Sequence, residues 1–314
     1  MIETSSGNRS EALIALARRQ MAQGDLAGAV GTLRKVLSSD PEDALAHALL
    51  ALCLLDQRRL RAAAHEVQLA LVQEPELPLA HFALGMLALA RQDTRQAEGH
   101  FRDGLEIDPQ DQTNAWGLAR AYLLRKDYDR ALEWVERALE LDPEWTMAMV
   151  SKGQIHLERN EIDQARHQAE QALNLDPEDA EACVLMGNLH FLRNDDETAR
   201  QLAAVALSRN PQDGAAVELI VKIRSRRNPF LRLWWHYASW MQRRRQSIQV
   251  LVLVIAYVGL NALMIGRLQG HTGPWVWWAA GAWLLFCVLT WAAPAMVGRA
   301  VEKELAASEL KPEY

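Results

Sequence analysis

The side chains with the clearest chemical potential are histidines that recur in pairs. His47 and His81 are 34 residues apart, and His156 and His190 repeat the same interval. Imidazole is a common zinc ligand, but a zinc site needs further ligands that converge, and none stands at a matching interval from either pair. We therefore interpret the pairs as packing residues repeated by duplication, with zinc binding as the alternative, and we predict no metal site.

The other reactive groups form no catalytic pattern. Cys53, Cys183 and Cys287 are widely separated, and we interpret them as buried small residues rather than a redox or metal motif. Acidic pairs such as Asp195 and Asp196 fall where turns are expected and are typical of solvated helix caps. The sequence contains no phosphate-binding glycine loop, no nucleophile elbow and no HExxH motif. We predict that the protein is not an enzyme and uses no cofactor.

A regular series of prolines defines the elements that must position these side chains. Consecutive members are always 34 residues apart, and an acidic residue precedes five of the six. Proline removes a helical hydrogen-bond donor and biases the preceding residue toward extended backbone, so each member is expected to end a helix at a fixed phase. The series consists of Pro41, Pro75, Pro109, Pro143, Pro177 and Pro211.

Three series of mostly small residues share this period. One begins at Ala17, one at Ala29 and one at Val36, and each recurs in steps of 34 residues. Small side chains at fixed phases let two helices approach closely, while the intervening Leu, Val and Phe residues fill the layer between them. The prolines and the three series together predict stacked helix pairs that share one continuous core.

This pattern resembles the tetratricopeptide repeat family, whose 34-residue helix-turn-helix unit has small residues at these phases and a terminal proline. The resemblance covers residues 10–213 as six repeats and is strongest at 112–145, where Tyr122 occupies the family's tyrosine position. It implies an all-α fold, built as a right-handed superhelix of six helix-turn-helix repeats. A flexible N-terminus is expected at residues 1–9.

The resemblance also implies a binding surface, because the first helix of each family repeat lines a concave groove. The Lys and Asn side chains with which some family members grip a peptide carboxylate are missing at the matching positions. An amphipathic helix of a protein partner is expected to lie on this largely apolar groove. The alternatives are that some of these residues pack inside their own helix pair, or that a helix of this chain fills the groove. The candidate groove residues are Leu45, Ala48, Leu52, Leu79, Phe82, Met86, Trp116, Arg120, Met147, Val150, Gln154, Val184 and Asn188.

The last third of the chain differs in composition from the rest. Residues 1–213 carry 22 basic and 35 acidic side chains, whereas residues 214–314 carry 12 basic and 5 acidic ones. Eight of the eleven tryptophans also lie beyond residue 230. A capping helix is expected over 214–228, because a solenoid exposes its last apolar face.

An interfacial helix is expected over residues 229–245, where aromatic residues at helical spacing precede three arginines. Such a helix suits a membrane surface with anionic headgroups. Nucleic-acid binding by the basic residues is the alternative, but an apolar segment follows at once, so we predict contact with phospholipid and not with nucleic acid. The predicted membrane-interface residues are Phe230, Trp234, Trp235, Tyr237, Trp240, Arg243, Arg244 and Arg245.

A transmembrane hairpin is predicted over residues 246–298. Its two uncharged spans, at about 247–266 and 275–297, are each long enough to cross a hydrocarbon core of about 30 Å. We interpret Asn261 as a hydrogen-bonding residue between the two spans, with a polar element of a transport path as the alternative. Basic residues are concentrated before the first span, which places the repeats and the tail at 299–314 in the cytoplasm.

Together these features predict that the protein is a membrane-anchored scaffold or adaptor. Its cytoplasmic repeats would bind a soluble or membrane protein partner, and tethering would raise the local concentration of that partner. The membrane is expected to be a bacterial inner membrane, since 28 Arg against 6 Lys and the abundance of Ala and Leu indicate a GC-rich bacterial genome. The alternative is a structural subunit or assembly factor of a membrane protein complex, with the hairpin as the main interface.

Overall fold

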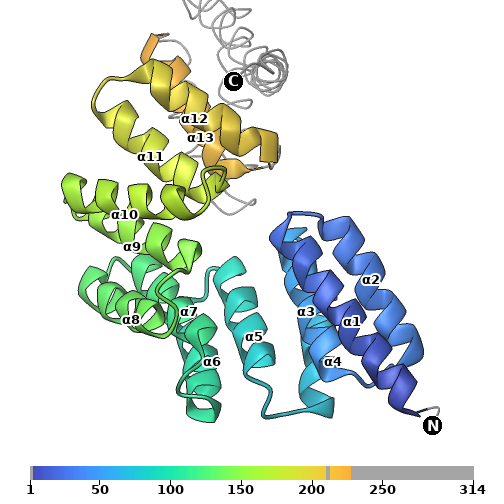
Figure 1. The fold of residues 1–314 in the computed structure, drawn as a ribbon. Helices are drawn as coiled ribbons and strands as arrows, with labels where there is room; N and C mark the ends of the chain where they lie inside the picture. The colour runs from blue at the N-terminus through green and yellow to red at the C-terminus, as the bar shows by residue number, and fades with distance from the viewer. Residues whose placement is uncertain (1–2, 210–212, 228–314) are drawn as a thin grey trace, which may run out of the picture. The chain divides into compact units, whose positions relative to one another are not determined.

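A computed structural model describes residues 3–209 and 213–227 of the chain. These residues form α-helices and no strand, so the predicted all-α class is confirmed for them and is consistent with a tetratricopeptide repeat superhelix (Figure 1). The helices are α1 (Glu3–Ala22), α2 (Leu26–Ser39), α3 (Ala44–Asp56), α4 (Leu60–Gln73), α5 (Pro78–Ala90), α6 (Thr94–Ile107), α7 (Gln112–Leu124), α8 (Tyr128–Leu141), α9 (Thr146–Glu158), α10 (Ile162–Leu175), α11 (Ala180–Leu192), α12 (Asp196–Arg209) and α13 (Gly214–Arg227).

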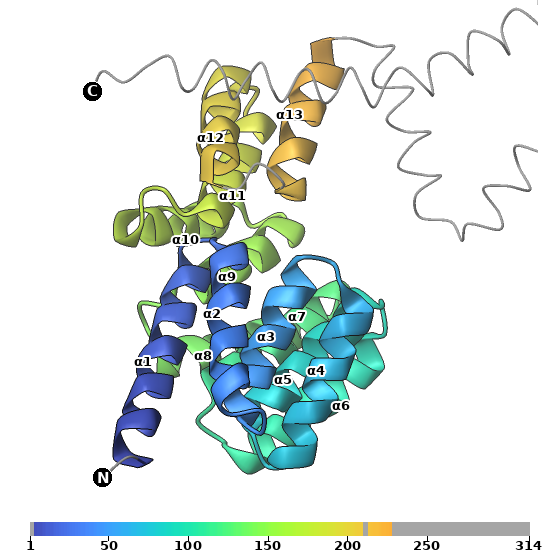
Figure 2. The same ribbon diagram turned by 90° about the vertical axis from the view of Figure 1, so that its right-hand side faces the viewer.

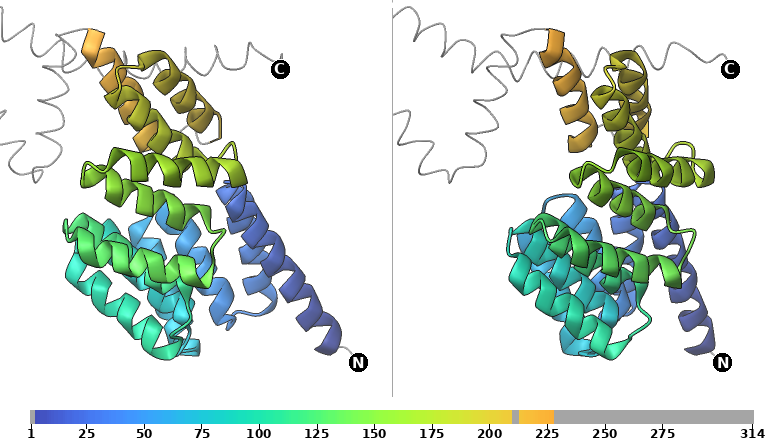
Figure 3. Two further views of the ribbon diagram at one scale, coloured as in Figure 1. Left: turned by 60° about the vertical axis from the view of Figure 1, so that its left-hand side comes forward. Right: turned by 90° about the vertical axis from the view of Figure 1, so that its left-hand side faces the viewer.

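The chain divides into two compact units, Met1–Leu189 and His190–Tyr314. In the first unit successive helices pack as pairs, from α1 with α2 to α9 with α10. The first helices of neighbouring pairs also contact one another, so that α3, α5 and α7 lie side by side (Figure 2). Figure 3 shows the same succession of pairs, coloured from blue to green, in two further views. In the second unit α12 packs against α13.

The acidic residue before each proline ends the second helix of a pair. Asp40, Glu74, Asp108, Asp142 and Asp176 all have extended backbone, with φ between −138° and −129°. The carboxylate of each of the four aspartates accepts a hydrogen bond from the backbone N–H two residues later, at 2.9–3.2 Å. This bond closes a turn around the proline, and the predicted helix ends are confirmed at these five positions.

A second periodic turn, inside each helix pair, is not evident from the proline pattern. Gly24, Arg58, Gln92, Lys126, Asn160 and Asn194 follow one another at 34-residue intervals, and all have φ between 59° and 76°. Left-handed backbone costs most side chains about 1–2 kcal/mol, and glycine is the residue that adopts it freely. Only the first of these turns contains glycine, so the other turns keep their geometry against this cost.

The Lys126→Gly substitution is expected to raise the free energy of unfolding of its repeat by about 0.5–1 kcal/mol. Glycine removes the strain of the left-handed backbone in the folded state, but it also increases the conformational entropy of the unfolded chain. The net stabilisation is the difference between these two effects. Asn160→Gly is the matched control and should gain less, because asparagine tolerates this backbone conformation better than lysine does. Amide hydrogen exchange of the full-length protein measures both changes, and equal gains at the two positions would contradict this explanation.

The three periodic series of small residues lie in the core, as predicted. Every residue of the three series, which begin at Ala17, Ala29 and Val36, is buried. The ring of Phe101 on α6 shows why small residues are needed, since it lies between α5 and α7. A methyl group added at Gly85 on α5 or at Gly117 on α7 would overlap this ring. Phe101 is fully buried and joins the two helix pairs.

Tyr122 is buried on α7, and its hydroxyl joins α7 to α6. The hydroxyl donates a hydrogen bond to Oε1 of Glu98 at 2.7 Å and accepts one from the guanidinium of Arg102 at 3.0 Å. Arg102 and Arg125 also form ion pairs with Glu98. The hydrogen bond from Tyr122, together with the two guanidinium groups, holds the pKa of Glu98 below its usual range.

The Glu98→Gln substitution is expected to lower the free energy of unfolding at pH 7 by about 1–2 kcal/mol. Because the pKa of Glu98 is lower in the folded than in the unfolded chain, its stabilising effect is full above the unfolded pKa of about 4.3. The effect is lost as the pH falls through the folded pKa. Urea titrations of wild type and variant, followed by circular dichroism, should therefore converge in acid. A difference that persists unchanged to pH 3 would exclude this origin.

At the N-terminus α1 begins at Glu3, inside the range 1–9 for which flexibility is expected, and that flexibility stays a prediction. No proline or left-handed residue interrupts the segment between Glu3 and Ala22, so nothing in it stops the helix. At the other end, α13 occupies most of the range 214–228 in which a capping helix is predicted. It buries Ala216, Leu219 and Ile220, and its role as a cap stays a prediction.

The predicted membrane elements lie outside the described residues. These are the interfacial helix at 229–245, the hairpin at 246–298 and the tail at 299–314. Among the helices that the structure does describe, none has the length and apolar character needed to cross a lipid bilayer.

Candidate functional site

The candidate groove residues form three rows along the first helices of the repeats, α3, α5, α7, α9 and α11. Members of a row are separated by 34 residues or a multiple of 34, so they occupy equivalent places on successive helices. All three rows lie within the first compact unit. We name them the Leu45 row (Leu45, Leu79 and Met147), the Ala48 row (Ala48, Phe82, Trp116, Val150 and Val184) and the Leu52 row (Leu52, Met86, Arg120, Gln154 and Asn188).

The Ala48 row is buried. Each of its residues is at most 8% exposed, so these side chains form a floor and leave little surface for a partner. The 34-residue period places the residues of this row on the first helices of the repeats, but it does not show whether their side chains are exposed. For this row the structure agrees with the alternative that part of the predicted groove packs among the helices.

Aromatic rings connect the floor across neighbouring repeats. The ring centre of Phe82 lies 5.8 Å from that of Phe101 and 6.1 Å from that of Trp116, and Trp116 lies 5.6 Å from Trp145. The indole N–H of Trp116 donates a hydrogen bond to the hydroxyl of Ser151 at 2.8 Å. These contacts tie α5, α6, α7 and α9 together and hold the floor in a fixed arrangement.

Sequence reasoning missed Trp145 and Phe101 as supports of this floor. A signal for Trp145 was present, because it stands at the helix start where other repeats have a capping aspartate such as Asp43 or Asp111. Leu77 is a second apolar exception at this position, and neither Leu77 nor Trp145 caps its helix through a side-chain hydrogen bond. An apolar residue at a capping phase indicates packing against a neighbouring repeat.

The other two rows are accessible. Met147 is 38% exposed and Gln154 is exposed, while the remaining members of the Leu45 and Leu52 rows are half-buried. The Leu52 row is apolar at Leu52 and Met86 and polar from Arg120 onward. The guanidinium carbon of Arg120 lies 4.8 Å from the ring centre of Trp116, an arrangement that holds the cation over the aromatic face. We call these two rows together the first-helix face.

Most of the repeated histidines are engaged by a carboxylate of their own. Nδ1 of His47 lies 2.7 Å from Glu66, and its Nε2 donates to the carbonyl of Pro41 at 3.0 Å. Nδ1 of His156 lies 2.6 Å from the carboxylate of Glu161, and Nδ1 of His190 lies 2.9 Å from that of Asp195. In these contacts the histidines act as packing and hydrogen-bonding residues.

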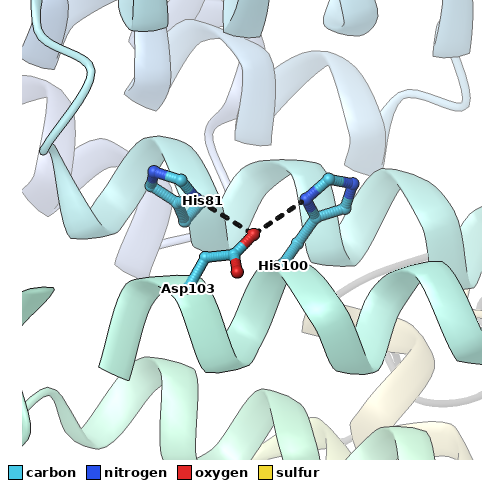
Figure 4. A group of neighbouring side chains, drawn as sticks. All are labelled: His81, His100 and Asp103. Atoms are coloured by element: carbon cyan, nitrogen blue, oxygen red, sulfur yellow. Dashed lines mark ion pairs between the residues drawn. The ribbon is translucent and has the colours of Figure 1, made fainter. Parts of the chain in front are cut away.

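His81 lies in a different environment, beside His100 and Asp103 (Figure 4). Nδ1 of His81 and Nδ1 of His100 approach the same carboxylate oxygen of Asp103, at 3.9 Å and 3.7 Å. Burial lowers the pKa of His100, and the Asp103 carboxylate acts in the opposite direction. The 34-residue interval did not reveal this group, because it pairs histidines of different repeats. His81, His100 and Asp103 instead converge within one repeat.

The described cysteines are buried, as predicted. Burial raises the pKa of both Cys53 and Cys183 to about 11, so each thiol is protonated near neutral pH and is a poor nucleophile. Cys287 lies outside the described residues. So do the predicted membrane-interface residues, which are Phe230, Trp234, Trp235, Tyr237, Trp240, Arg243, Arg244 and Arg245.

Comparison with known proteins identifies the repeats. Two tetratricopeptide repeat models match the chain, one at residues 88–149 and the other at residues 14–78 and 150–214. No curated protein matches it. Similar solved structures include a tetratricopeptide repeat protein from Parabacteroides merdae, with 20% identity and a TM-score of 0.54 over 67% of this chain and 82% of that one.

Two further solved structures have comparable similarity. A chain of the APC/C hetero-tetramer Cut9-Hcn1 is 16% identical, with a TM-score of 0.53 over 68% of this chain and 42% of that one. PilW, a type IV pilus biogenesis factor, is 16% identical, with a TM-score of 0.50 over 67% of this chain and 98% of that one. At these identities the likeness shows the fold alone.

Proposed function

Because the chain belongs to the tetratricopeptide repeat family, whose repeats suggest a protein-interaction scaffold or adaptor, we propose that it is a membrane-anchored adaptor. In this proposal the first-helix face binds a protein partner, and the C-terminal part holds the complex at a bacterial inner membrane. Proteins of this family are generally non-enzymatic scaffolds, which agrees with a binding role and no reaction of its own.

The observation that carries the binding proposal is the first-helix face itself. Two accessible rows flank a buried floor that aromatic contacts hold in place, so a partner meets a preorganised surface. The apolar side chains of Leu52 and Met86 followed by the polar ones of Arg120 and Gln154 fit an amphipathic helix. The apolar residues of that partner helix would contact Leu52 and Met86, and its polar residues would contact Arg120 and Gln154.

The membrane part of the proposal is supported by the sequence beyond the described residues. Two uncharged stretches of 21 and 23 residues, at 246–266 and 275–297, are separated by a short loop. Basic residues are concentrated before the first stretch, which favours cytoplasmic repeats and a cytoplasmic C-terminus. The repeat part carries a net charge of −13, so the basic residues before the first stretch, and not the repeats, would attract anionic lipid.

Co-purification of the tagged full-length protein in mild detergent, with quantitative mass spectrometry, tests the binding proposal. A Met86→Asp, Met147→Asp variant places charge on the first-helix face and should lower recovery of the partner at least tenfold. Val72→Asp is the matched control, because Val72 is an apolar residue of α4 that is 74% exposed, outside the face. Circular dichroism verifies that both variants are folded. Equal recovery with wild type and the double variant, or loss with the control, would refute the proposed face.

The alternative function, a structural subunit or assembly factor, is favoured by the tryptophans and small residues of the second predicted span. Exchange of residues 246–298 for an unrelated transmembrane hairpin separates the two functions. An adaptor should keep its partner and its cellular role after the exchange. A subunit whose main interface is the hairpin should lose both.

A further inference from the structure

Two imidazoles and a carboxylate meet between the helices of the third repeat. His81 comes from α5, and His100 and Asp103 come from α6, where they are three residues apart on one helix face (Figure 4). One ligand atom from each residue lies within 4.8 Å of the other two. The side chain of His81 is 16% exposed, that of His100 33% and that of Asp103 53%, so the group opens toward solvent on one side.

The hydrogen bond of His81 fixes which of its nitrogens is available. Nε2 lies 3.0 Å from the carbonyl oxygen of Pro75, and because a carbonyl only accepts hydrogen bonds, this nitrogen carries the proton. In the neutral ring Nδ1 then presents a lone pair. Within the described residues Nδ1 is buried and has no hydrogen-bond partner. A buried acceptor without a hydrogen-bond partner is uncommon in folded proteins, and this one lies 3.9 Å from the carboxylate of Asp103.

The second repeat has a histidine, His47, at the position equivalent to His81, but its partner is different. His47 stands one repeat before His81 and makes the same Nε2 hydrogen bond, to the carbonyl of Pro41 at 3.0 Å. Its Nδ1 is paired with Glu66 at 2.7 Å. One repeat later, the position of Glu66 is His100 and the position of Leu69 is Asp103. Duplication therefore explains His81, but it does not explain the exchange of its carboxylate partner for a second imidazole and a nearby carboxylate.

We propose that His81, His100 and Asp103 form a binding site for a divalent transition-metal ion, with Zn²⁺ as the ion that best fits this ligand set. Nδ1 of His81, Nδ1 of His100 and a carboxylate oxygen of Asp103 supply three ligands, and water fills the remaining position. Imidazole and carboxylate are typical zinc ligands. The hydrogen bond from Nε2 of His81 to a backbone carbonyl is the outer-shell contact that orients a metal-binding histidine.

The distances approach this geometry and would reach it if the three side chains moved closer together. Zinc bonds of about 2.0–2.2 Å in a tetrahedron place neighbouring ligand atoms about 3.4 Å apart. The two separations to the carboxylate oxygen are 3.9 Å and 3.7 Å, so each has to shorten by a few tenths of an ångström. The two imidazole nitrogens lie within 4.8 Å of each other, so they have to approach by up to about 1.4 Å. The side chains of His100 and Asp103 are 33% and 53% exposed, so rotation of these two side chains is the movement that would close the site. The ion would then link α5 to α6.

Calorimetric titration of the tag-free full-length protein with Zn²⁺, after removal of metals by a chelator, tests the site. Wild type should bind one Zn²⁺ per chain at this site with a Kd in the micromolar range or below. His100→Glu, Asp103→Leu restores the residues of the second repeat, including a carboxylate partner for His81, and should weaken binding at least 100-fold. His47→Gln is the matched control and should leave the affinity within twofold of wild type.

A second measurement separates a specific site from weak binding to surface histidines. Saturating Zn²⁺ should raise the thermal midpoint of wild type and slow hydrogen exchange in α5 and α6, but it should do neither in the double variant. If the double variant does not fold, His100→Gln replaces it, since this partly exposed residue can be changed without disturbing the core. The absence of stoichiometric binding to wild type, or equal affinity in the altered proteins, would overturn the proposal.

Discussion

The Phe101→Ala variant is expected to lower the free energy of unfolding of the third and fourth repeats by about 3–5 kcal/mol. The ring of Phe101 is fully buried between Gly85 and Gly117, and neither glycine has a side chain that can fill the space left by the ring. The surrounding helices can relax only in part, so a cavity remains. Hydrogen exchange of the full-length protein, resolved by peptide, should show the loss first in α5, α6 and α7.

Ile107→Ala on the same helix is the control for this prediction. Ile107 is 36% exposed, so its truncation should cost less than about 1 kcal/mol. A similar cost at the two positions would show that Phe101 is not the main link between the two helix pairs. The same result would also weaken the explanation of the small residues at Gly85 and Gly117.

The Phe82→Asp variant is expected to unfold the third repeat locally. Phe82 is 8% exposed, and its ring contacts those of Phe101 and Trp116, so a charge at this position would be desolvated among aromatic rings. The loss of the ring alone costs about 3–5 kcal/mol, and the buried carboxylate adds to it. Limited proteolysis should therefore cut within α5 and α6 of the variant at a rate at least tenfold higher than in wild type.

Met86→Asp is the matched control, since Met86 lies on the same helix but in the half-buried Leu52 row. Met86 packs at the edge of the core, so this variant should be cut faster than wild type but clearly more slowly than Phe82→Asp. If Phe82→Asp were as resistant as wild type, Phe82 would belong to the accessible surface and not to the floor. The comparison has a practical consequence, because any loss of binding in a Phe82 variant would report unfolding and not the loss of a contact.

Sequence periodicity predicts much of this fold because each signal has a local cause. Proline at a fixed phase ends a helix through its own covalent structure, and the series that begins at Ala29 marks close helix approach wherever it recurs. The left-handed turns at Arg58 and Lys126 escaped prediction, because tertiary packing imposes this backbone conformation on residues that do not favour it.

The candidate site was predicted less completely. The period assigns Trp116 and Gln154 to the first helices, but it cannot show that Trp116 is buried and Gln154 is exposed. Burial depends on side chains of other repeats, such as Trp145. The approach of His81 to His100 was likewise hidden, because it arises from packing between α5 and α6 and has no counterpart in the 34-residue spacing.

Site-specific photo-crosslinking in cells tests the central claim, that the first-helix face binds a protein partner, most directly. A photoreactive residue replaces Gln154 on α9 or, as the control, Gln171 on α10 of the same repeat; both are exposed glutamines. The adaptor account predicts a discrete cross-linked protein from position 154 and none from position 171. No product at 154, or the same product at both positions, would contradict it.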